Sequence, residues 1–339
     1  MTTEYKNQPS DSTRVSRLFR RIRHHRYAGL FVNLSPSAFW LTVFFVLPLI
    51  VMLYYSFGER GAFGEVLLGP ANLGLQQYAQ FFVPDGGNIL GAAWVTLLWT
   101  VQGFIPFGIK LTSLAPTPYV QLTIKSIGYG LITTLVSFAF GYPMAYYVGR
   151  LAPKKWRNQL LILVVLPYWA SYLVRVYAIK LLLSRNGIVW SLTQWLPFVD
   201  GGVRLLHTAF SVQFGLVYIW IPFMILPVYA SIEQLDFTLH EAAMDLGADR
   251  LDAFRKVTLP LSMPGVIAGS ILVFIPSVGA YVIPSLLGSP STPTIGEFIA
   301  DQFGAAGNWA LGSAAAFVLM GIMLVAIALY QRNAGGDLL

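Results

Sequence analysis

The chain lacks cysteine altogether and is poor in charged residues. Only 11% of its 339 residues are Asp, Glu, Lys or Arg, whereas 56% are hydrophobic. Without cysteine, neither disulfide bonds nor thiolate metal sites can form. Soluble domains carry about 25% charged residues, so a deficit of this size predicts a membrane protein.

Sequence motifs for catalysis are missing as well. No Gly-Lys pair occurs, so the chain has no phosphate-binding P-loop, and no Gly-x-Ser-x-Gly turn offers a hydrolase nucleophile. No metal-binding spacing such as His-Glu-x-x-His includes any of the four histidines, which are His24, His25, His207 and His240. We expect a protein that is not an enzyme and that binds no cofactor or metal of its own.

Long gaps between charged residues locate the segments that cross the membrane. A helix needs roughly 20 apolar residues to span a bilayer. Charge-free stretches cover residues 27–58, 126–149, 205–232, 257–296 and 302–331, and a shorter one, 158–174, continues past Arg175 and Lys180. We predict an all-α polytopic fold with six transmembrane helices at about 37–57, 126–149, 159–182, 206–231, 262–287 and 309–331.

Beyond the first span, seven prolines lie within the predicted transmembrane helices. A proline breaks a helix in the membrane only where the freed backbone carbonyls find other partners, so a kink is the simpler expectation for each one. The prolines are Pro143, Pro167, Pro222, Pro227, Pro264, Pro276 and Pro284.

The distribution of Lys and Arg predicts the orientation, because cytoplasmic loops are enriched in basic residues. Six spans with a cytoplasmic N-terminus put 15 basic residues inside and 5 outside. A further crossing at 86–109 would change this division to 11 and 9. We therefore predict that both termini are cytoplasmic and that 86–109 stays on the outer face, as a re-entrant or interfacial helix or as a buried helix of the outer loop.

A charged loop between two apolar segments carries the most specific pattern. It reads Glu241-Ala-Ala-Met-Asp-Leu-Gly247, followed by Val257-Thr-Leu-Pro260. Thr238 precedes Glu241 by three residues, which is the spacing of a capping box at a helix start. Gly247 is suited to end that helix in the left-handed conformation, and Asp249 can cap a second helix. The loop is therefore predicted to form two short helices joined at a glycine.

This loop resembles the EAA loop of bacterial ABC-importer permeases, in which Glu-Ala-Ala, Gly, an aliphatic residue and Leu-Pro recur at these spacings. Other segments resemble the B-type half of spermidine/putrescine importers: Gly141-Tyr-Pro-Met-Ala-Tyr-Tyr, the run from Leu166 to Gly187, the run from Trp220 to Ser231, the run from Pro276 to Gly288, and the approach to the last span from Ile295 to Ser313. The resemblance covers about 36–332, and the segment at about 86–118 is extra.

The resemblance implies a binding-protein-dependent transport system inner membrane component with a type I importer permease fold. The domains would be a cytoplasmic basic tail at 1–35, a permease domain at 36–332 with its coupling loop at 233–258, and a short tail at 333–339. Implied partners are a second homologous permease subunit, two copies of a cytoplasmic ATPase that binds ATP and Mg, and an extracytoplasmic solute-binding protein. The coupling residues would be Glu241, Ala242, Ala243, Gly247, Leu259 and Pro260.

The resemblance implies a polyamine such as spermidine or putrescine as the solute. An opine, another amino-acid-like compound, thiamine or ferric iron is the alternative, and an ion-coupled secondary transporter is a third, although such proteins usually carry carboxylates within their spans and internal repeats. Neither feature is evident here. Aromatic faces bind ammonium groups, and candidates for the substrate path are Tyr168, Trp169, Tyr172, Trp220 and Tyr281.

Arg175 and Lys180 lie within a predicted span, where a charge is costly and often functional. They could line the path or bind a helix end. The simpler expectation is that Lys180 extends towards the membrane surface and that Arg175 donates to backbone carbonyls where spans pack.

Overall fold

The computed structural model describes residues 28–62, 64–69, 72–83, 91–92, 95–97, 116–185, 187–194, 204–290 and 292–334. The chain divides into two compact units, Met1–Tyr55 and Ser56–Leu339. The predicted N-terminal tail lies outside the described residues up to position 27, the C-terminal tail lies outside them from position 335, and most of the extra segment at 86–118 lies outside them too.

The described part of the first unit, residues 28–55, is one helical run. Helix α2 (Ala28–Leu41), the π-helical turn η1 (Thr42–Val46) and helix α3 (Leu47–Tyr55) follow one another without a break. The part from Leu34 to Tyr55 has a mean hydropathy of 2.2 over 22 residues. A helix of this length that is apolar on every side is typical of a membrane span.

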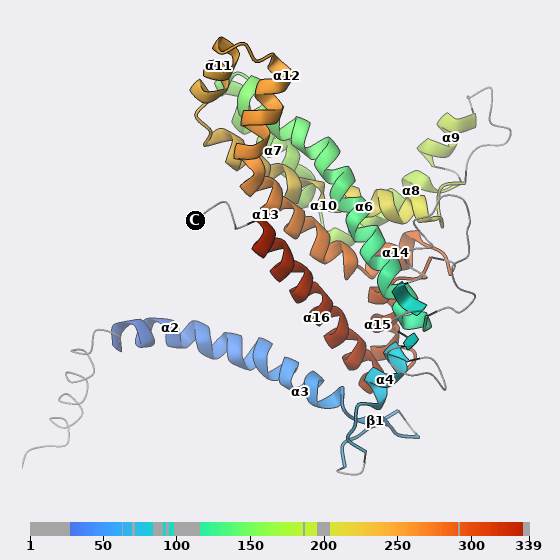
Figure 1. Cartoon of the computed structure of the whole chain (residues 1–339). Helices are drawn as coiled ribbons and strands as arrows, with labels where there is room; N and C mark the ends of the chain where they lie inside the picture. The colour runs from blue at the N-terminus through green and yellow to red at the C-terminus, as the bar shows by residue number, and fades with distance from the viewer. Residues whose placement is uncertain are drawn as a thin grey trace, which may run out of the picture. The chain divides into compact units, whose positions relative to one another are not determined.

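Three long helices form the core of the second unit. These are α6 (Pro118–Tyr146), α10 (Ala209–Glu233) and α13 (Leu259–Val278), which pack against one another along much of their length (Figure 1). Small residues permit this close approach, as is common between helices in membranes. A β-carbon added at Gly269 would lie 2.9 Å from the sulfur of Met224, and one at Gly265 would lie 2.5 Å from the carbonyl oxygen of Pro227.

The third predicted span, 159–182, is not one straight helix. The chain continues from α6 through the π-helical turn η2 (Tyr147–Leu151) into α7 (Lys154–Val165), the 3₁₀ turn η3 (Leu166–Trp169), α8 (Tyr172–Leu183) and α9 (Ile188–Gln194). The segments Lys154–Trp169 and Tyr172–Leu192 meet at 90°. Pro167 lies in η3, and Ala170 and Ser171 are extended, which interrupts the helical hydrogen bonds.

The fifth predicted span, 262–287, is also divided. Helix α13 ends at Val278, and the short helix α14 (Val282–Leu287) follows after Gly279, Ala280 and Tyr281. Helix α15 (Ile295–Phe303) and the last long helix, α16 (Trp309–Ala334), complete the chain. Two-residue strands β1 (Glu59–Arg60) and β2 (Val66–Leu67) pair antiparallel, and α4 (Gln76–Phe82) follows them near one end of α16.

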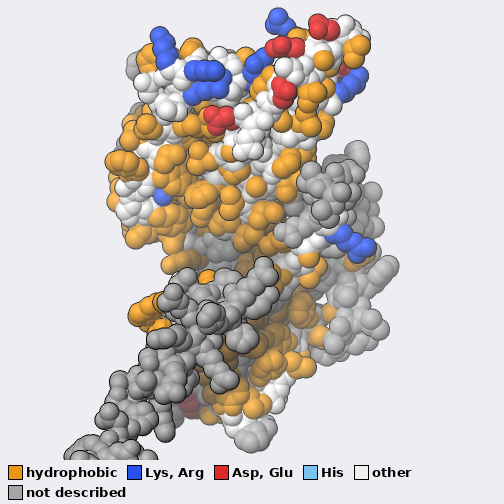
Figure 2. All heavy atoms as spheres, turned by 90° about the vertical axis from the view of Figure 1, so that its left-hand side faces the viewer, with side chains coloured by type: hydrophobic (Ala, Val, Ile, Leu, Met, Phe, Trp, Pro, Cys, Tyr) orange, Lys and Arg blue, Asp and Glu red, His pale blue; other side chains and the backbone are white. Residues whose placement is uncertain are grey.

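Charged and hydrophobic side chains occupy different parts of the surface of the second unit. Lys, Arg, Asp and Glu side chains gather at one end of the face in Figure 2, and a broad hydrophobic band lies beside them. Among the described residues, five helices are long and apolar enough to cross a membrane, or six if the bent pair counts as one span. The predicted all-α polytopic fold is therefore confirmed, with its third span bent and its fifth span at Arg250–Val278 instead of 262–287.

Candidate functional site

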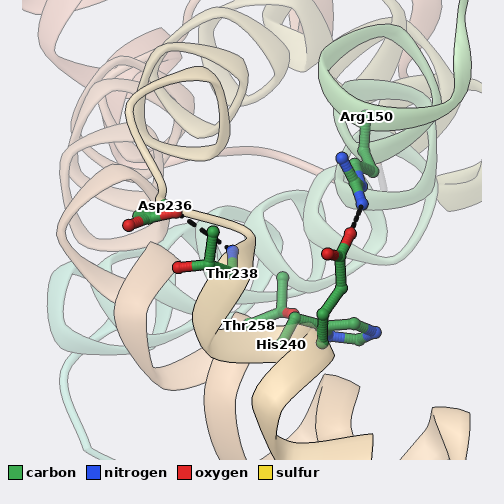
Figure 3. Close-up of polar contacts among 6 residues, drawn as sticks. Arg150, Asp236, Thr238, His240 and Thr258 are labelled. Carbon is green, nitrogen blue, oxygen red and sulfur yellow. Dashed lines mark hydrogen bonds and ion pairs between the residues drawn. The ribbon is translucent and has the colours of Figure 1, made fainter.

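The loop that begins with α11 (Thr238–Asp245) lies at the charged end of the second unit, beside α12 (Arg250–Ala253) (Figure 1). The predicted capping box is wrong. A carboxylate oxygen of Asp236 accepts a hydrogen bond from the Thr238 backbone N–H at 3.0 Å, and the Thr238 side chain makes no cap (Figure 3). The next N–H groups of the helix, from Leu239 to Glu241, donate to the backbone carbonyls of Asp236 and Phe237, so this helix start does not depend on the Glu241 carboxylate.

The hydrogen bond from Thr238 also affects Asp236 itself. It stabilises the charged carboxylate, so the pKa of Asp236 lies below its ordinary value. The start of α11 is therefore held by an ionised side chain at neutral pH.

Glu241 pairs with an arginine from a distant part of the sequence. An Nη atom of Arg150, in η2, lies 3.0 Å from a carboxylate oxygen of Glu241 (Figure 3). The Arg150 guanidinium also lies 4.2 Å from the ring centroid of Phe237, directly before α11. Exposed ion pairs contribute only about 0–1 kcal/mol to stability, so the consequence of this contact is geometric. It ties α11 to the end of α6.

Gly247 ends α11 as the sequence predicts. Its φ angle is +93°, in the left-handed region that residues with side chains rarely adopt. The Gly247 N–H donates to the Met244 carbonyl at 2.9 Å and the Ala248 N–H donates to the Ala243 carbonyl at 3.0 Å. This pair of bonds is the Schellman motif, which satisfies carbonyls at a helix end. A β-carbon at Gly247 would meet nothing within 4 Å, so the requirement for glycine comes from the backbone alone.

The second short helix runs directly into a membrane segment. Asp249 caps α12 by accepting from the Asp252 N–H at 2.6 Å, as predicted. The π-helical turn η4 (Phe254–Thr258) then joins α12 to α13. His240 Nδ1 lies 2.9 Å from the buried hydroxyl of Thr258, which links α11 to this turn (Figure 3).

The predicted coupling residues divide into two groups. Glu241, Ala242 and Gly247 are exposed and Ala243 is half-buried, whereas Leu259 packs beside the helix core and Pro260 lies in the first turn of α13. Three large apolar side chains, Leu239, Leu246 and Leu251, are exposed along the same two helices, and Leu246 is 90% exposed. Exposed leucines among charged residues are suited to contact another protein.

The predicted path residues differ in how far they are exposed. Tyr168 and Trp220 are half-buried and both contact the ring of Phe223, with centroids 5.6 Å apart in each case. Tyr172 packs against a core cluster that includes Val176 and Ile283. By contrast, Trp169 is 85% exposed and Tyr281, in the break between α13 and α14, is 52% exposed.

Sequence reasoning missed Arg150 as a partner of Glu241. In the sequence, Arg150 is only one of the basic residues from which the membrane orientation is predicted. Its signal is weak, because a contact across 91 positions depends on how α6 and α11 pack. Among the described residues, no group of three or more histidine, aspartate or glutamate side chains could hold a metal ion.

Comparison with known proteins decides the family. The family described as "Binding-protein-dependent transport system inner membrane component" matches residues 137–334, which contain the whole of the loop described above. The chain belongs to this family. The permease is therefore the membrane subunit of an ABC importer and not an enzyme.

Curated relatives agree with this assignment. The permease is 36% identical over 241 residues to the spermidine/putrescine transport system permease protein PotB of Escherichia coli, covering 71% of this chain and 85% of that protein. It is 39% identical over 248 residues to PotB of Haemophilus influenzae, covering 72% and 86%. It is 35% identical over 305 residues to the inner membrane ABC transporter permease protein YdcU of E. coli, covering 78% and 95%.

A solved structure supports the fold. A chain of a bacterial ABC transporter that imports the acidic polysaccharide alginate matches with a TM-score of 0.64 at 17% identity, covering 95% of the permease and 99% of that chain. The predicted importer-permease fold is confirmed by this likeness. At this identity the likeness concerns the fold alone.

Proposed function

We propose that the permease imports a polyamine such as spermidine or putrescine. The observation that carries the proposal is the identity of 36–39%, over at least 85% of their length, to relatives named as spermidine/putrescine permeases. An opine, an amino-acid-like compound, thiamine or ferric iron remains the alternative solute, because YdcU, which is covered over 95% of its length, has a name that states no solute.

The assembly proposed for the permease has four kinds of subunit. A second homologous permease completes the path, two copies of a cytoplasmic ATPase bind ATP and Mg, and an extracytoplasmic binding protein delivers the solute. The family's description as binding-protein-dependent supports the last of these. The excess of basic residues in the loops assigned to the cytoplasm supports an inner-membrane orientation with both termini inside.

The proposed docking surface for the ATPase consists of Leu239, Leu246 and Leu251 with the exposed Ala242. Its apolar side chains can be buried against a partner, and the small side chain of Ala242 allows a close approach. Gly247 fixes the angle between α11 and α12. Leu259 and Pro260 lie at the start of α13, so their proposed role is to connect the loop to the membrane.

The proposed coupling follows from the contacts of the loop. Helix α11 is tied to α6 through Glu241 and Arg150, and α12 continues through η4 into α13. A displacement of the docked loop is therefore applied to two of the three core helices at once. Closure of the ATPase dimer on ATP would then favour one of two states of the spans, inward-open or outward-open.

The proposed path is lined by aromatic side chains and offers only weak contacts to a cation. Tyr168, Tyr172, Trp220 and Tyr281, together with the exposed Trp169, are the candidates, and ring faces attract ammonium groups. No carboxylate lies within the charge-free segments. The choice of solute is therefore assigned mainly to the binding protein.

Reconstitution tests this function. The permease is assembled with its neighbouring-gene permease, ATPase and binding protein in liposomes, and uptake of radiolabelled spermidine is measured with ATP and with a non-hydrolysable analogue inside. We expect uptake only with ATP. Uptake driven by an ion gradient without ATP would contradict the importer mechanism. ATP-dependent uptake of thiamine, iron or an opine, but not of polyamines, would contradict the solute.

A further inference from the structure

A cavity lies between α14 and α15, at the end of the second unit away from α11 and α12 (Figure 1). Its volume is about 430 Å³, within the range of roughly 300–1,000 Å³ that is usual for small-ligand sites. The walls come from α14, from the loop that follows it, from α15 and from Leu122 of α6. Glu297 and Asp301 line this cavity, and neither Lys nor Arg is among the described residues that do so.

The two carboxylates have no counter-charge in the described part of the chain, where the ion pairs join other side chains. Glu297 is half-buried and Asp301 is exposed, so a solute can reach them. Burial raises the pKa of Glu297 above its ordinary value and the Asp301 carboxylate raises it further, whereas the backbone of Thr294 lowers it in part. A cation in the cavity would therefore stabilise the charged form of Glu297.

The stability of α15 accounts for one of these carboxylates but not for the other. Glu297 lies in the first turn, where the helix dipole favours a negative charge. Asp301 lies in the last turn of the same helix, where the dipole disfavours one. The two residues are four positions apart, so they share one face of the helix and repel each other. A bound cation would offset both penalties.

The lining of the cavity is better suited to ammonium groups than to a metal ion. Ca²⁺ takes about six to eight oxygen ligands, and the described residues contain no group of three or more acidic or histidine side chains that could hold a metal. An ammonium group donates up to three hydrogen bonds and is attracted by ring faces. The Ser285 hydroxyl, which donates to the Val282 carbonyl at 3.0 Å, can accept from such a group, and Phe298 supplies a ring to the same cavity.

The cavity adjoins the break between α13 and α14. The Ser285 N–H donates to the Tyr281 carbonyl at 3.0 Å, so the wall formed by α14 begins one turn after a candidate path residue. In the proposed orientation this end of the second unit faces the outside. A cation bound here would lie next to the outer end of the proposed path.

We propose that this cavity is an entry site, in which Glu297 and Asp301 bind the ammonium groups of a solute that carries two or more of them. The inference rests on the proposed import of a polyamine. The site receives the solute after its release from the binding protein. The aromatic path beyond it then needs only weak contacts.

The test measures binding without transport. The assembled importer, in nanodiscs without ATP and without the binding protein, is titrated with radiolabelled spermidine at constant ionic strength. The double variant Glu297→Gln with Asp301→Asn keeps the shape of both side chains and removes both charges, so it should weaken spermidine binding by about tenfold or more. Each single variant should show a smaller loss. Glu297→Asp keeps the charge and should bind spermidine better than Glu297→Gln does.

Two controls separate binding from folding and from general attraction. Without solute, Asp301→Asn should leave the unfolding temperature unchanged or raise it, because it removes an unfavourable charge from the last turn of α15. Glu59→Gln, at a half-buried carboxylate in β1 that does not line the cavity, should leave spermidine binding unchanged. An equal loss of binding in Glu59→Gln would overturn the proposal.

Other results would also overturn the entry site. Unchanged spermidine binding in the double variant would remove it, and displacement of spermidine by an equal concentration of Mg²⁺ would assign the carboxylates to a metal ion. Weaker retention of the binding protein with unchanged spermidine binding would assign them to docking. ATP-dependent uptake is measured in parallel. Uptake without carboxylate-dependent binding contradicts the entry site alone, whereas carboxylate-dependent binding without uptake contradicts only the proposed function.

Discussion

Two arginines of the permease make the same kind of aromatic contact in opposite surroundings. Arg150 lies 4.2 Å from the ring of Phe237, has a carboxylate partner in Glu241, and its side chain is 37% exposed. Arg175 lies 4.0 Å from the ring of Tyr168, is 9% exposed and has no carboxylate partner among the described residues. The first charge is satisfied within the chain and contributes little to stability. The second leaves two buried nitrogens without an acceptor among the described residues, which is costly.

The difference indicates how the two ends of the second unit are used. The loop that contains Glu241 is a complete local structure, with a cap at each short helix and a hydrogen bond between α11 and η4. It can keep its shape when it meets a partner. At the bend, by contrast, the Nε and Nη1 atoms of Arg175 are buried without an acceptor among the described residues.

The largest effect is expected at the glycine between the two short helices. Gly247→Val should abolish transport while leaving the protein in the membrane, because a β-branched residue at a φ of +93° is strained and the angle between α11 and α12 would change. Uptake and membrane content are measured in parallel.

Two controls define the cause at Gly247. Asn adopts the left-handed conformation more readily than other residues, so Gly247→Asn should retain part of the uptake. Gly128→Ala, at a helical glycine with open space around it, should be tolerated. Full transport by Gly247→Val would remove the coupling role of the turn.

The second prediction tests directly whether the two arginines differ in their contribution to stability. In the isolated permease, Arg150→Met should lower the free energy of unfolding by no more than about 1 kcal/mol, the range for an exposed ion pair. Arg175→Met should leave that free energy unchanged or increase it. Thermal unfolding in one detergent measures both variants. If both lowered it by the same amount, the two arginines would not differ as described.

The third prediction concerns a smaller effect. It asks whether the ion pair of Arg150 and Glu241 transmits movement of α11 to α6 or only stabilises the fold. Arg150→Met, Glu241→Gln and the double variant should show an interaction energy of about 0.2–1 kcal/mol in unfolding. The same cycle on Lys256 and Asp252, an exposed pair at 2.8 Å within α12 and η4, is the control. ATP-dependent uptake should fall only in the first cycle, since only that pair joins two separate segments. A similar fall in both cycles would argue for a general loss of stability.

The smallest effect concerns pH at the exposed end. The pKa of Asp236 is below its ordinary value, so its cap on α11 is present above the unfolded pKa of about 4 and is lost as the pH falls through the folded value. Titration of the Thr238 amide resonance should report this change below pH ~4. Asp236→Asn should remove the inflection. An unchanged titration in that variant would assign the cap to another group.

Local features of the candidate site could be predicted from the sequence, whereas its long-range contacts could not. The left-handed turn at Gly247 and the cap at Asp249 follow from residue type and spacing alone. The contact between Arg150 and Glu241 depends on the packing of segments 91 positions apart. The capping box failed because a carboxylate two residues upstream, Asp236, competes for the same helix start.

The bend in the third span and the end of the fifth span at Val278 could not be predicted from the positions of the prolines. Pro143, Pro222, Pro227, Pro264 and Pro276 lie inside continuous helices, whereas Pro167 and Pro284 lie beside breaks. Proline thus occurs both inside continuous helices and beside breaks. Whether a helix continues through it depends on the neighbours that accept the freed carbonyls, and single-chain patterns do not contain that information.

The helical run from α12 into α13 is continuous, so its length determines how far one end moves when the other end is tilted. The segment Arg250–Val278 has 29 residues, which corresponds to a rod of roughly 44 Å at 1.5 Å per residue. If this rod tilts by about 5° about the end that carries α12, its far end moves by about 4 Å. That far end adjoins Tyr281, so under the proposed coupling a small tilt at the exposed loop would displace a candidate path residue by several ångströms.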